Sequence, residues 1–285
     1  MPKSSRRLLT LVDVIKPSRQ TIICDVGANP LGDPVYKPLL RAGICQVWGF
    51  EPQKDAYDKL CETADVNENY VNAAIGSGKD ETLRICRSSG FSSLLEPSKA
   101  TIGLLQRWQK QMTVVDRVTL HTTALDDLDD LPAPDLLKID IQGAELSVFN
   151  SGASKLASTG CIISEVAFIP LYEHQPLIAD QISALSELGF HLHRFMHLVA
   201  KPIGSKLRQK TNWRKNHNQL IDGDAVFIRR LMNLQTIGDE ELKHLAICAE
   251  GIFQSRDIVL LCLDILLDRG SVLASSVQTY IDDLE

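Results

Sequence analysis

Polar side chains that could do chemistry gather where an apolar, strand-like run of this sequence ends. In the stretch 136–145, a buried-strand pattern leads into Asp140, Gln142, Gly143 and Glu145. A carboxylate beyond a strand can hold a hydroxyl group or accept its proton, and a glycine lets the chain turn there. We therefore expect this stretch to form one wall of a site.

Two earlier strand-like runs end in a similar way. The first leads through Asp25 to Gly27 and Asn29, and the second leads to Glu51, which lies 26 residues beyond Asp25. Asn29 stands where the dinucleotide-binding fingerprint has its second glycine, so the pattern is not that fingerprint. A carboxylate at the position of Glu51 can bind both hydroxyls of a ribose. The spacing favours a nucleotide-binding site.

Apolar runs of strand length alternate with helical patterns along the chain. The expected strands are 21–26, 46–51, 69–75, 135–141, 161–168, 190–196 and 224–229. Strands apolar on both faces are typical of a parallel sheet covered by helices on each side, which binds ligands beyond its carboxyl edge. We expect such an α/β sandwich. Two alternating stretches, 82–87 and 117–123, predict an inserted hairpin-like or edge element.

The pattern divides the chain into an N-terminal extension (1–20), a main domain (21–230) and a helical C-terminal extension (231–285). The stretch 258–267 is apolar nearly all round, so we expect it to be buried against the main domain or a partner. A homo-oligomer could form through these helices.

Composition limits the classes of function. A net charge of -6 and a pI near 5.7 argue against binding of a polyanion over the whole surface. No apolar stretch is long enough for a membrane span. The seven cysteines lack metal-ligand spacing and are predicted to be free thiols in a reducing compartment. We expect a cytoplasmic protein without a membrane span.

These motifs, together with the segments 72–76, 90–94 and 165–172, resemble the FkbM family of S-adenosylmethionine-dependent methyltransferases. The resemblance runs from about Thr21 to Asp224. It implies a Rossmann-like class I methyltransferase sandwich with a mostly parallel seven-stranded sheet. It also implies O-methylation of a hydroxyl on a sugar, a glycan or a secondary metabolite.

The resemblance assigns a cofactor site. The backbone from Gly27 to Asn29 would face the methionine part of S-adenosylmethionine. Asp25 would help fix its amino group directly or through water, and the region from Asn72 to Ile75 would frame the adenine. The expected cofactor-binding residues are Asp25, Gly27, Ala28, Asn29, Glu51, Pro52, Asn72, Ala73, Asp140 and Gln142.

The loop after the first strand departs from the usual family form, which runs straight into a helix. Pro30 and Pro34 each remove an N–H group and bias the preceding residue away from helical angles. We expect a longer, less regular loop, and a helix with Asp33 as N-cap and Pro34 at its first position.

Three residues are candidates for catalysis. Asp140 is expected near the transferred methyl group, and Glu165 could share a proton with it, position a hydroxyl or help to bind a divalent cation. A metal is not predicted, because a third acid cannot be located from the sequence. His174 could be a base or an ordinary surface residue.

Acceptor-binding residues are expected in three segments. Ser92 and Ser93 could bind acceptor oxygens or start a helix, and Glu145 could bind the acceptor or favour a helix N-terminus. The stretch 188–221 has seven Lys or Arg and no acid. It could be a lid, with Arg208 and Trp213, over a phosphorylated or carrier-bound acceptor, or a solvated loop.

Two other functions compete with O-methylation of a small molecule or glycan. One is a nucleic-acid methyltransferase that uses the basic stretch as its contact surface, but the chain lacks the Asn-Pro-Pro-Tyr type of motif and a separate binding domain. The other is a cofactor-binding interaction protein without catalysis. We expect no nucleic-acid partner.

Overall fold

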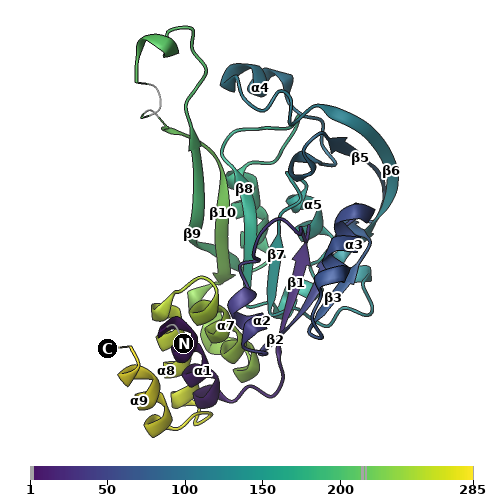
Figure 1. Cartoon of the computed structure of the whole chain (residues 1–285). Helices are drawn as coiled ribbons and strands as arrows, with labels where there is room; N and C mark the ends of the chain where they lie inside the picture. The colour runs from purple at the N-terminus through teal and green to yellow at the C-terminus, as the bar shows by residue number, and fades with distance from the viewer. Residues whose placement is uncertain (1–2, 213–214, 216, 285) are drawn as a thin grey trace.

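The computed structural model describes residues 3–212, 215 and 217–284. Within these ranges, seven strands form a central sheet in the order β3-β2-β1-β7-β8-β10-β9 (Figure 1). They are β1 (Thr21–Val26), β2 (Cys45–Phe50), β3 (Glu68–Val71), β7 (Leu136–Ile139), β8 (Cys161–Ala167), β9 (Phe190–Lys201) and β10 (Gln219–Arg229). In the described sheet only β10 runs opposite to the other six strands. The predicted mostly parallel seven-stranded sheet is confirmed.

A smaller sheet stands beside the main one. It contains β4 (Ala74–Gly76), β5 (Asp80–Cys86) and β6 (Val114–Ala124), and α4 (Lys99–Leu105) lies between the last two in sequence. This is the inserted element that the sequence predicts. The expected strand 69–75 divides into two, because the chain turns at Asn72 and Ala73 and β4 pairs with β6 instead of β2.

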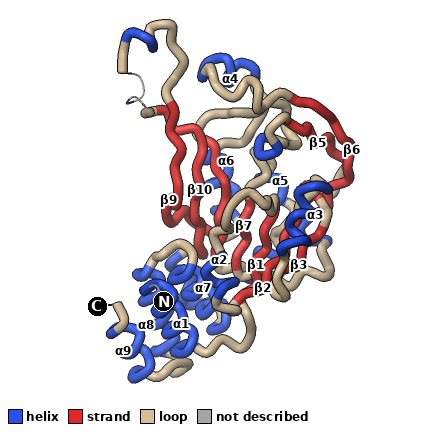
Figure 2. The backbone as a smooth tube through the Cα atoms, viewed as in Figure 1, coloured by secondary structure: helices blue, strands red, loops and turns tan. Residues whose placement is uncertain are grey.

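Helices cover both faces of the main sheet (Figure 2). One face packs against α5 (Glu145–Asn150) and α6 (Ile178–Glu187). The other packs against α1 (Lys3–Ile15), α2 (Lys37–Arg41), α7 (Asp239–Gly251), α8 (Arg256–Asp268) and α9 (Ala274–Asp282). Alternate residues of a strand point to opposite faces of the sheet, so Ile23 lies in one core and Cys24 in the other. The remaining helix, α3 (Lys54–Thr63), packs beside β3 at the sheet edge.

The first helix packs among the last ones. Glu250 of α7 accepts hydrogen bonds from Arg7 Nε at 3.0 Å and from the Tyr280 hydroxyl at 2.7 Å. A salt bridge of 2.7 Å joins Arg6 to Asp283. The described parts of 1–20 and 231–285 therefore share a core with the sheet, and the three-part division of the chain remains a proposal.

The loop that follows β1 has no regular structure from Ala28 to Pro34, as the prolines predict. The helix after it, however, begins at Lys37 with Tyr36 as N-cap, later than the predicted start at Pro34. Pro38 occupies the first turn, where a missing N–H group costs nothing because that group would have no partner in the helix.

At the carboxyl edge, β9 and β10 continue as a hairpin that projects from the body of the molecule (Figure 1). Among the described residues between them, Arg208–Lys210 forms a short 3-10 turn. None of the described helices is long and apolar enough to cross a membrane.

Candidate active site

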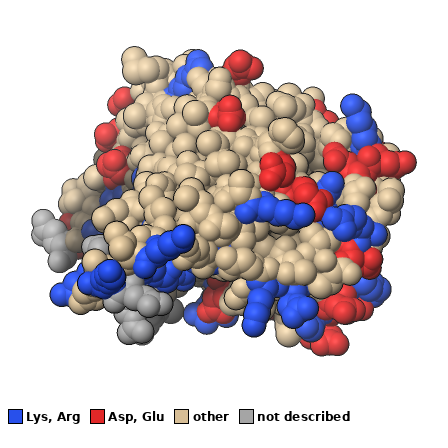
Figure 3. Space-filling model, turned by 90° about the horizontal axis from the view of Figure 1, so that it is seen from above, with Lys and Arg blue, Asp and Glu red and all other residues tan. Residues whose placement is uncertain are grey.

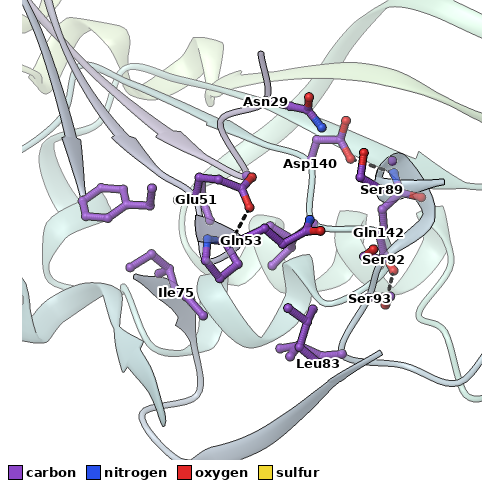
Figure 4. A pocket seen from close by; sticks show the side chains of 18 of the residues that line it. Asn29, Glu51, Gln53, Ile75, Leu83, Ser89, Ser92, Ser93, Asp140 and Gln142 are labelled. Carbon is purple, nitrogen blue, oxygen red and sulfur yellow. Dashed lines mark hydrogen bonds between the residues drawn. The ribbon is translucent and has the colours of Figure 1, made fainter. Parts of the chain in front are cut away.

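A pocket opens beyond the carboxyl ends of β1, β2 and β7, and the inserted segment closes its far side (Figure 4). The predicted site residues that line it are Gly27, Asn29, Glu51, Pro52, Ala73, Ser92, Ser93, Asp140 and Gln142. Three segments far apart in the sequence therefore meet here, as their positions at strand ends predict.

Close packing of two strand ends shapes the pocket. Gly27 has a φ of +81°, and a Cβ atom at this position would lie 2.0 Å from the carbonyl oxygen of Asp140. The N–H group of Asp140 donates to Val26 at 3.0 Å, and that of Gly27 donates to Phe50 at 3.0 Å. Only glycine allows this approach, which holds the ends of β1, β2 and β7 against one another.

Glu51 presents a buried carboxyl group to the pocket. Its side chain is 4% exposed, and Oε1 accepts the N–H group of Gln53 at 2.7 Å. Burial raises the pKa of this carboxyl to about 7, although the Gln53 N–H group opposes the shift. Glu51 is therefore close to half ionised near neutral pH.

The structure gives Asn72 a different position from the one expected beside the adenine. Its side-chain nitrogen donates to the carbonyl oxygens of Glu51 at 2.8 Å and Pro52 at 3.1 Å. It does not line the pocket, whereas Ala73 does. Asn72 thus holds the Glu51 loop in place.

Asp25 and Ala28 lie behind the cofactor loop and do not line the pocket. The Tyr36 hydroxyl donates to Oδ2 of Asp25 at 2.6 Å, and Nζ of Lys138 lies 3.1 Å from Oδ1. Burial alone would lower the pKa of Lys138, but Asp25, Asp140 and other acids raise it instead. Asp25 thus supports the loop from below, and its contact with the amino group of the cofactor, directly or through water, remains a proposal.

Sequence reasoning did not identify Lys138 or Tyr36. A lysine in an otherwise apolar buried strand requires a charged partner, and that rule could have pointed to Lys138. Tyr36 gave no such signal, because its contact depends on where the helix after the loop begins.

Gln142 joins the two candidate catalytic carboxylates. Its Nε2 donates to Oδ1 of Asp140 at 2.9 Å and lies 3.1 Å and 3.0 Å from the two oxygens of Glu165. The Tyr172 hydroxyl lies 3.0 Å from Gln142 Oε1, and the Ser93 hydroxyl donates to the Gln142 carbonyl at 2.7 Å. These contacts hold Gln142 at a φ of +56°, which is uncommon for a residue with a side chain.

The arrangement of the Asp140 and Glu165 carboxyl groups favours a state in which the two share one proton. Burial, followed by the charges of Asp140 and Glu145, raises the pKa of Glu165 well above its ordinary value. Two neighbouring carboxyl groups in a buried place do not ionise together easily. Glu165 is therefore the neutral member of the pair at neutral pH.

Glu145 supports the loop between β7 and α5. Its Oε1 accepts the N–H groups of Ile141 and Gly143, each at 3.0 Å, and burial raises its pKa to about 7. Among the described residues, Asp140, Glu145 and Glu165 each offer an oxygen within 4.8 Å of the others. Glu145, expected from the sequence only as an acceptor-binding or helix-start residue, thus lies close enough to be a third acid, although Gln142 Nε2 already bridges the other two.

Ser92 and Ser93 line the pocket, but their hydroxyls make internal contacts. Ser92 Oγ accepts the N–H group of Cys86 at 3.1 Å, and Ser93 Oγ accepts that of Leu95 at 2.9 Å. Neither starts a helix, because Ser98 is the N-cap of α4.

The remaining predicted residues lie away from this pocket. His174 is exposed, in a turn with a φ of +58°. Arg208 lines a separate hollow in the β9–β10 hairpin. Trp213 lies outside the described residues.

An adenosyl group with a polar tail fits the main pocket. Glu51 offers a carboxylate for ribose hydroxyls, while Phe50, Ile75 and Leu83 make an apolar region suited to a base. Gly27 and Asn29 bring backbone groups to the opposite side, next to Asp140.

Comparisons with known proteins agree with this geometry. A family model described as the methyltransferase FkbM domain matches residues 25–192. The hexuronic acid methyltransferase AglP of Haloferax volcanii is 28% identical over 152 residues, which are 51% of this chain and 55% of that protein. The chain thus spans about half the length of this curated relative.

Two solved methyltransferases are also similar. Precorrin-6y C5,15-methyltransferase from Geobacter metallireducens has 16% identity and a TM-score of 0.36, covering 78% of this chain and 84% of that one. Magnesium protoporphyrin IX methyltransferase from Synechocystis has 10% identity and a TM-score of 0.38, covering 80% and 78%. The family model, which spans more than half of the 285 residues, carries the assignment. The protein therefore belongs to the FkbM family of S-adenosylmethionine-dependent methyltransferases, as its motifs predict.

Proposed function

We propose that this protein methylates a hydroxyl group of a sugar or glycan, or of a secondary metabolite, with S-adenosylmethionine as methyl donor. Asp140 carries the proposal, since it lines the cofactor pocket and contacts the Gln142 amide beside Glu165. A hydroxyl acceptor needs a group that takes its proton. The similarity to a hexuronic acid methyltransferase favours a sugar acceptor.

In this proposal three segments of the chain bind different parts of the cofactor. Glu51 accepts hydrogen bonds from the ribose hydroxyls, the region of Ala73 and Ile75 covers the base, and the backbone of Gly27 faces the methionine part. When bound, the cofactor would supply an electrophilic methyl group attached to a sulfonium sulfur. The sulfur would keep the electrons of the broken C–S bond and become a neutral thioether. Most of the rate enhancement then comes from holding the acceptor oxygen in line.

Asp140 and Glu165 take part in removing the proton of the acceptor hydroxyl. Asp140 takes the proton of the acceptor hydroxyl as the oxygen forms its bond to the methyl carbon. Neutral Glu165 holds the Gln142 amide in place while Asp140 takes the proton, because this amide contacts both side chains. The Asp140 carboxylate, which only accepts hydrogen bonds, determines that Nε2 of this amide faces the carboxyl groups, and the Tyr172 hydroxyl lies beside its Oε1.

Replacing Asp140 tests this role. Asp140→Asn should reduce turnover by about 10²–10⁴-fold, the usual contribution of a general base, while calorimetry finds a much smaller loss of affinity for S-adenosylmethionine. The acceptor can be found by screening hexuronic acids, neutral sugars and their glycosides for formation of S-adenosylhomocysteine. Full turnover by the variant on the same acceptor would remove Asp140 from the mechanism.

A carrier-linked or phosphorylated sugar is the form of acceptor that we favour. Lys201 and Arg208 support it, because both line a hollow on the hairpin that also presents Ser205 and Thr211. Cations and hydroxyl groups of this kind bind phosphate oxygens. A phosphorylated acceptor should have a lower KM than the free sugar, and equal KM values for both would contradict this choice.

A further inference from the structure

Positive charge is concentrated in two segments of this acidic protein. Residues 97–115 contain three Lys or Arg and residues 197–218 contain six, and neither segment has an Asp or Glu. Together these 41 residues hold 9 of the 30 basic residues, so the rest of the chain has 21 basic and 36 acidic residues, a net charge of -15. The charge of the molecule is therefore strongly polarised.

The two segments form one continuous surface, which we call the cap surface. The N–H group of Gly204 donates to the carbonyl oxygen of Leu104 at 3.0 Å, and a Cβ atom on Gly204 would lie 2.4 Å from the same oxygen. Beneath this contact, Ile102 and Leu105 share a small core with Ile221. Both segments accordingly lie at the same end of the molecule (Figure 1).

Apolar side chains stand on this surface without cover from the described part of the chain. Leu104 is 59% exposed, Ile203 52% and Leu207 62%. Ile203 and Leu207 line one hollow together with Lys201 and Arg208, and Lys206 and Lys210 beside it are exposed. Seen from above, charged side chains lie mostly around the rim of a broad uncharged surface (Figure 3).

We propose that the cap surface docks on an anionic lipid bilayer. Exposed aliphatic side chains with lysines around them are what an interfacial segment needs: the apolar groups enter the headgroup region, and the cations meet lipid phosphates. Nucleic acid fits this surface less well, because single-stranded bases stack on aromatic side chains, whereas the exposed large apolar residues in the described part of the cap surface are aliphatic.

Docking of this kind leaves the cofactor pocket open. No described residue of the cap surface lines that pocket. The inference therefore goes beyond the proposed methyl transfer. The phosphate of an acceptor and that of a lipid would use the same hollow, lined by Lys201 and Arg208, so the docking test is made without an acceptor.

The test measures binding of the full-length protein to sedimented vesicles. Vesicles of phosphatidylcholine with phosphatidylglycerol should bind the protein, and vesicles of phosphatidylcholine alone should bind it much less. Replacing Lys206, Lys210 and Lys215 with Ser should weaken binding to the anionic vesicles roughly a hundredfold, from about 1 kcal/mol for each lysine near the lipid surface. Ile203→Ser with Leu207→Ser should weaken it as well.

A matched control changes three exposed lysines elsewhere, Lys16, Lys59 and Lys79, to Ser. It removes the same charge and should bind vesicles as the parent does. Calorimetry with S-adenosylmethionine should give the parent affinity for every variant, so loss of folding and failure of the methyltransferase assignment are both distinguished from loss of docking.

Three results would overturn the inference. The first is equal binding to neutral and anionic vesicles. The second is an equal loss in the cap and control triple variants. The third is tighter binding to a short DNA duplex than to anionic vesicles, unaffected by the Ile203 and Leu207 changes, which would make the cap surface a nucleic-acid surface.

Discussion

Gln142 is the side chain on which the arrangement of the two carboxyl groups depends. Its left-handed backbone conformation costs roughly 1–2 kcal/mol for a residue with a Cβ atom. Contacts from Ser93 to its carbonyl and from Tyr172 to its side chain offset that cost. Since the Asp140 carboxylate only accepts hydrogen bonds, Nε2 faces Asp140 and Glu165, and Oε1 faces the Tyr172 hydroxyl.

Tyr172→Phe should therefore slow methyl transfer without preventing cofactor binding. The change removes the contacts of the hydroxyl with Gln142 Oε1 at 3.0 Å and with the Phe91 carbonyl oxygen at 3.1 Å. A hydrogen bond of this kind is worth about 1 kcal/mol, and its loss lets the Gln142 amide turn. We expect kcat to fall several-fold and the pH dependence of kcat to shift, while the KM for S-adenosylmethionine stays the same.

Tyr280→Phe is the matched control, because its hydroxyl is equally committed to a buried carboxylate, Glu250, far from the site. It should change stability only. If both variants had the parent pH profile, Tyr172 would have no positioning role.

Because the Glu51 carboxyl is buried, we expect pH to have opposite effects on the stability of the fold and on the affinity for S-adenosylmethionine. Its pKa is about 7 in the folded protein and 4.5 when freely exposed. Between these values the folded protein holds more protons than the unfolded chain, so stability falls as pH rises, by about 3 kcal/mol over the window. Ribose hydroxyls need the ionised form, so affinity for S-adenosylmethionine should rise over the same window.

Glu51→Gln separates the two effects. At pH 8 the free variant should be more stable to urea than the parent, while its affinity for S-adenosylmethionine should be weaker by about 1.5–3 kcal/mol and nearly independent of pH. Glu62→Gln, at an exposed carboxylate of α3, should change neither quantity. A pH-dependent affinity in Glu51→Gln would assign the titration to another group.

At the scale of elements, two glycines of the loop after β1 differ in what surrounds them. Gly27 and Gly32 both have positive φ angles, +81° and +94°, but only the Cβ position of Gly27 meets other atoms. Gly32→Ala should cost about 1 kcal/mol for its backbone conformation. Gly27→Ala should cost more, and should also abolish cofactor binding, because β1 and β7 must separate.

Urea unfolding and calorimetry of the two glycine variants measure this difference. Equal losses of stability, with cofactor binding intact in both, would mean that the contact between Gly27 and Asp140 does not shape the pocket.

The elements were largely predictable from the sequence because each strand carries its own signal. Apolar runs located the seven strands, and polar residues at their ends located Asp140, Glu51 and Gln142. Contacts that depend on tertiary packing left no such signal. Tyr172 meets Gln142 across 30 residues of sequence, and Tyr36 meets Asp25 only because the helix begins three residues later than the prolines suggest.

At the scale of the whole molecule, the helices beyond β10 complete one face of the sheet. Leu245 of α7 is almost fully buried in the core that includes Ile23 and Val226. Leu245→Ala should lower the free energy of unfolding by about 2–5 kcal/mol, with one cooperative transition. Leu273→Ala, at a position 69% exposed in the same layer, is the control. Two separate transitions in urea would mean that the C-terminal helices fold as an independent unit.

The position of α1 has a consequence for the order of events during synthesis. Its partners α7 and α9 are more than 220 residues away in the sequence, so α1 leaves the ribosome long before any of them exists. The apolar face that it shares with the sheet stays uncovered for most of translation, and loop closure over such a distance is slow. The growing chain therefore keeps this apolar face exposed until its last helices arrive.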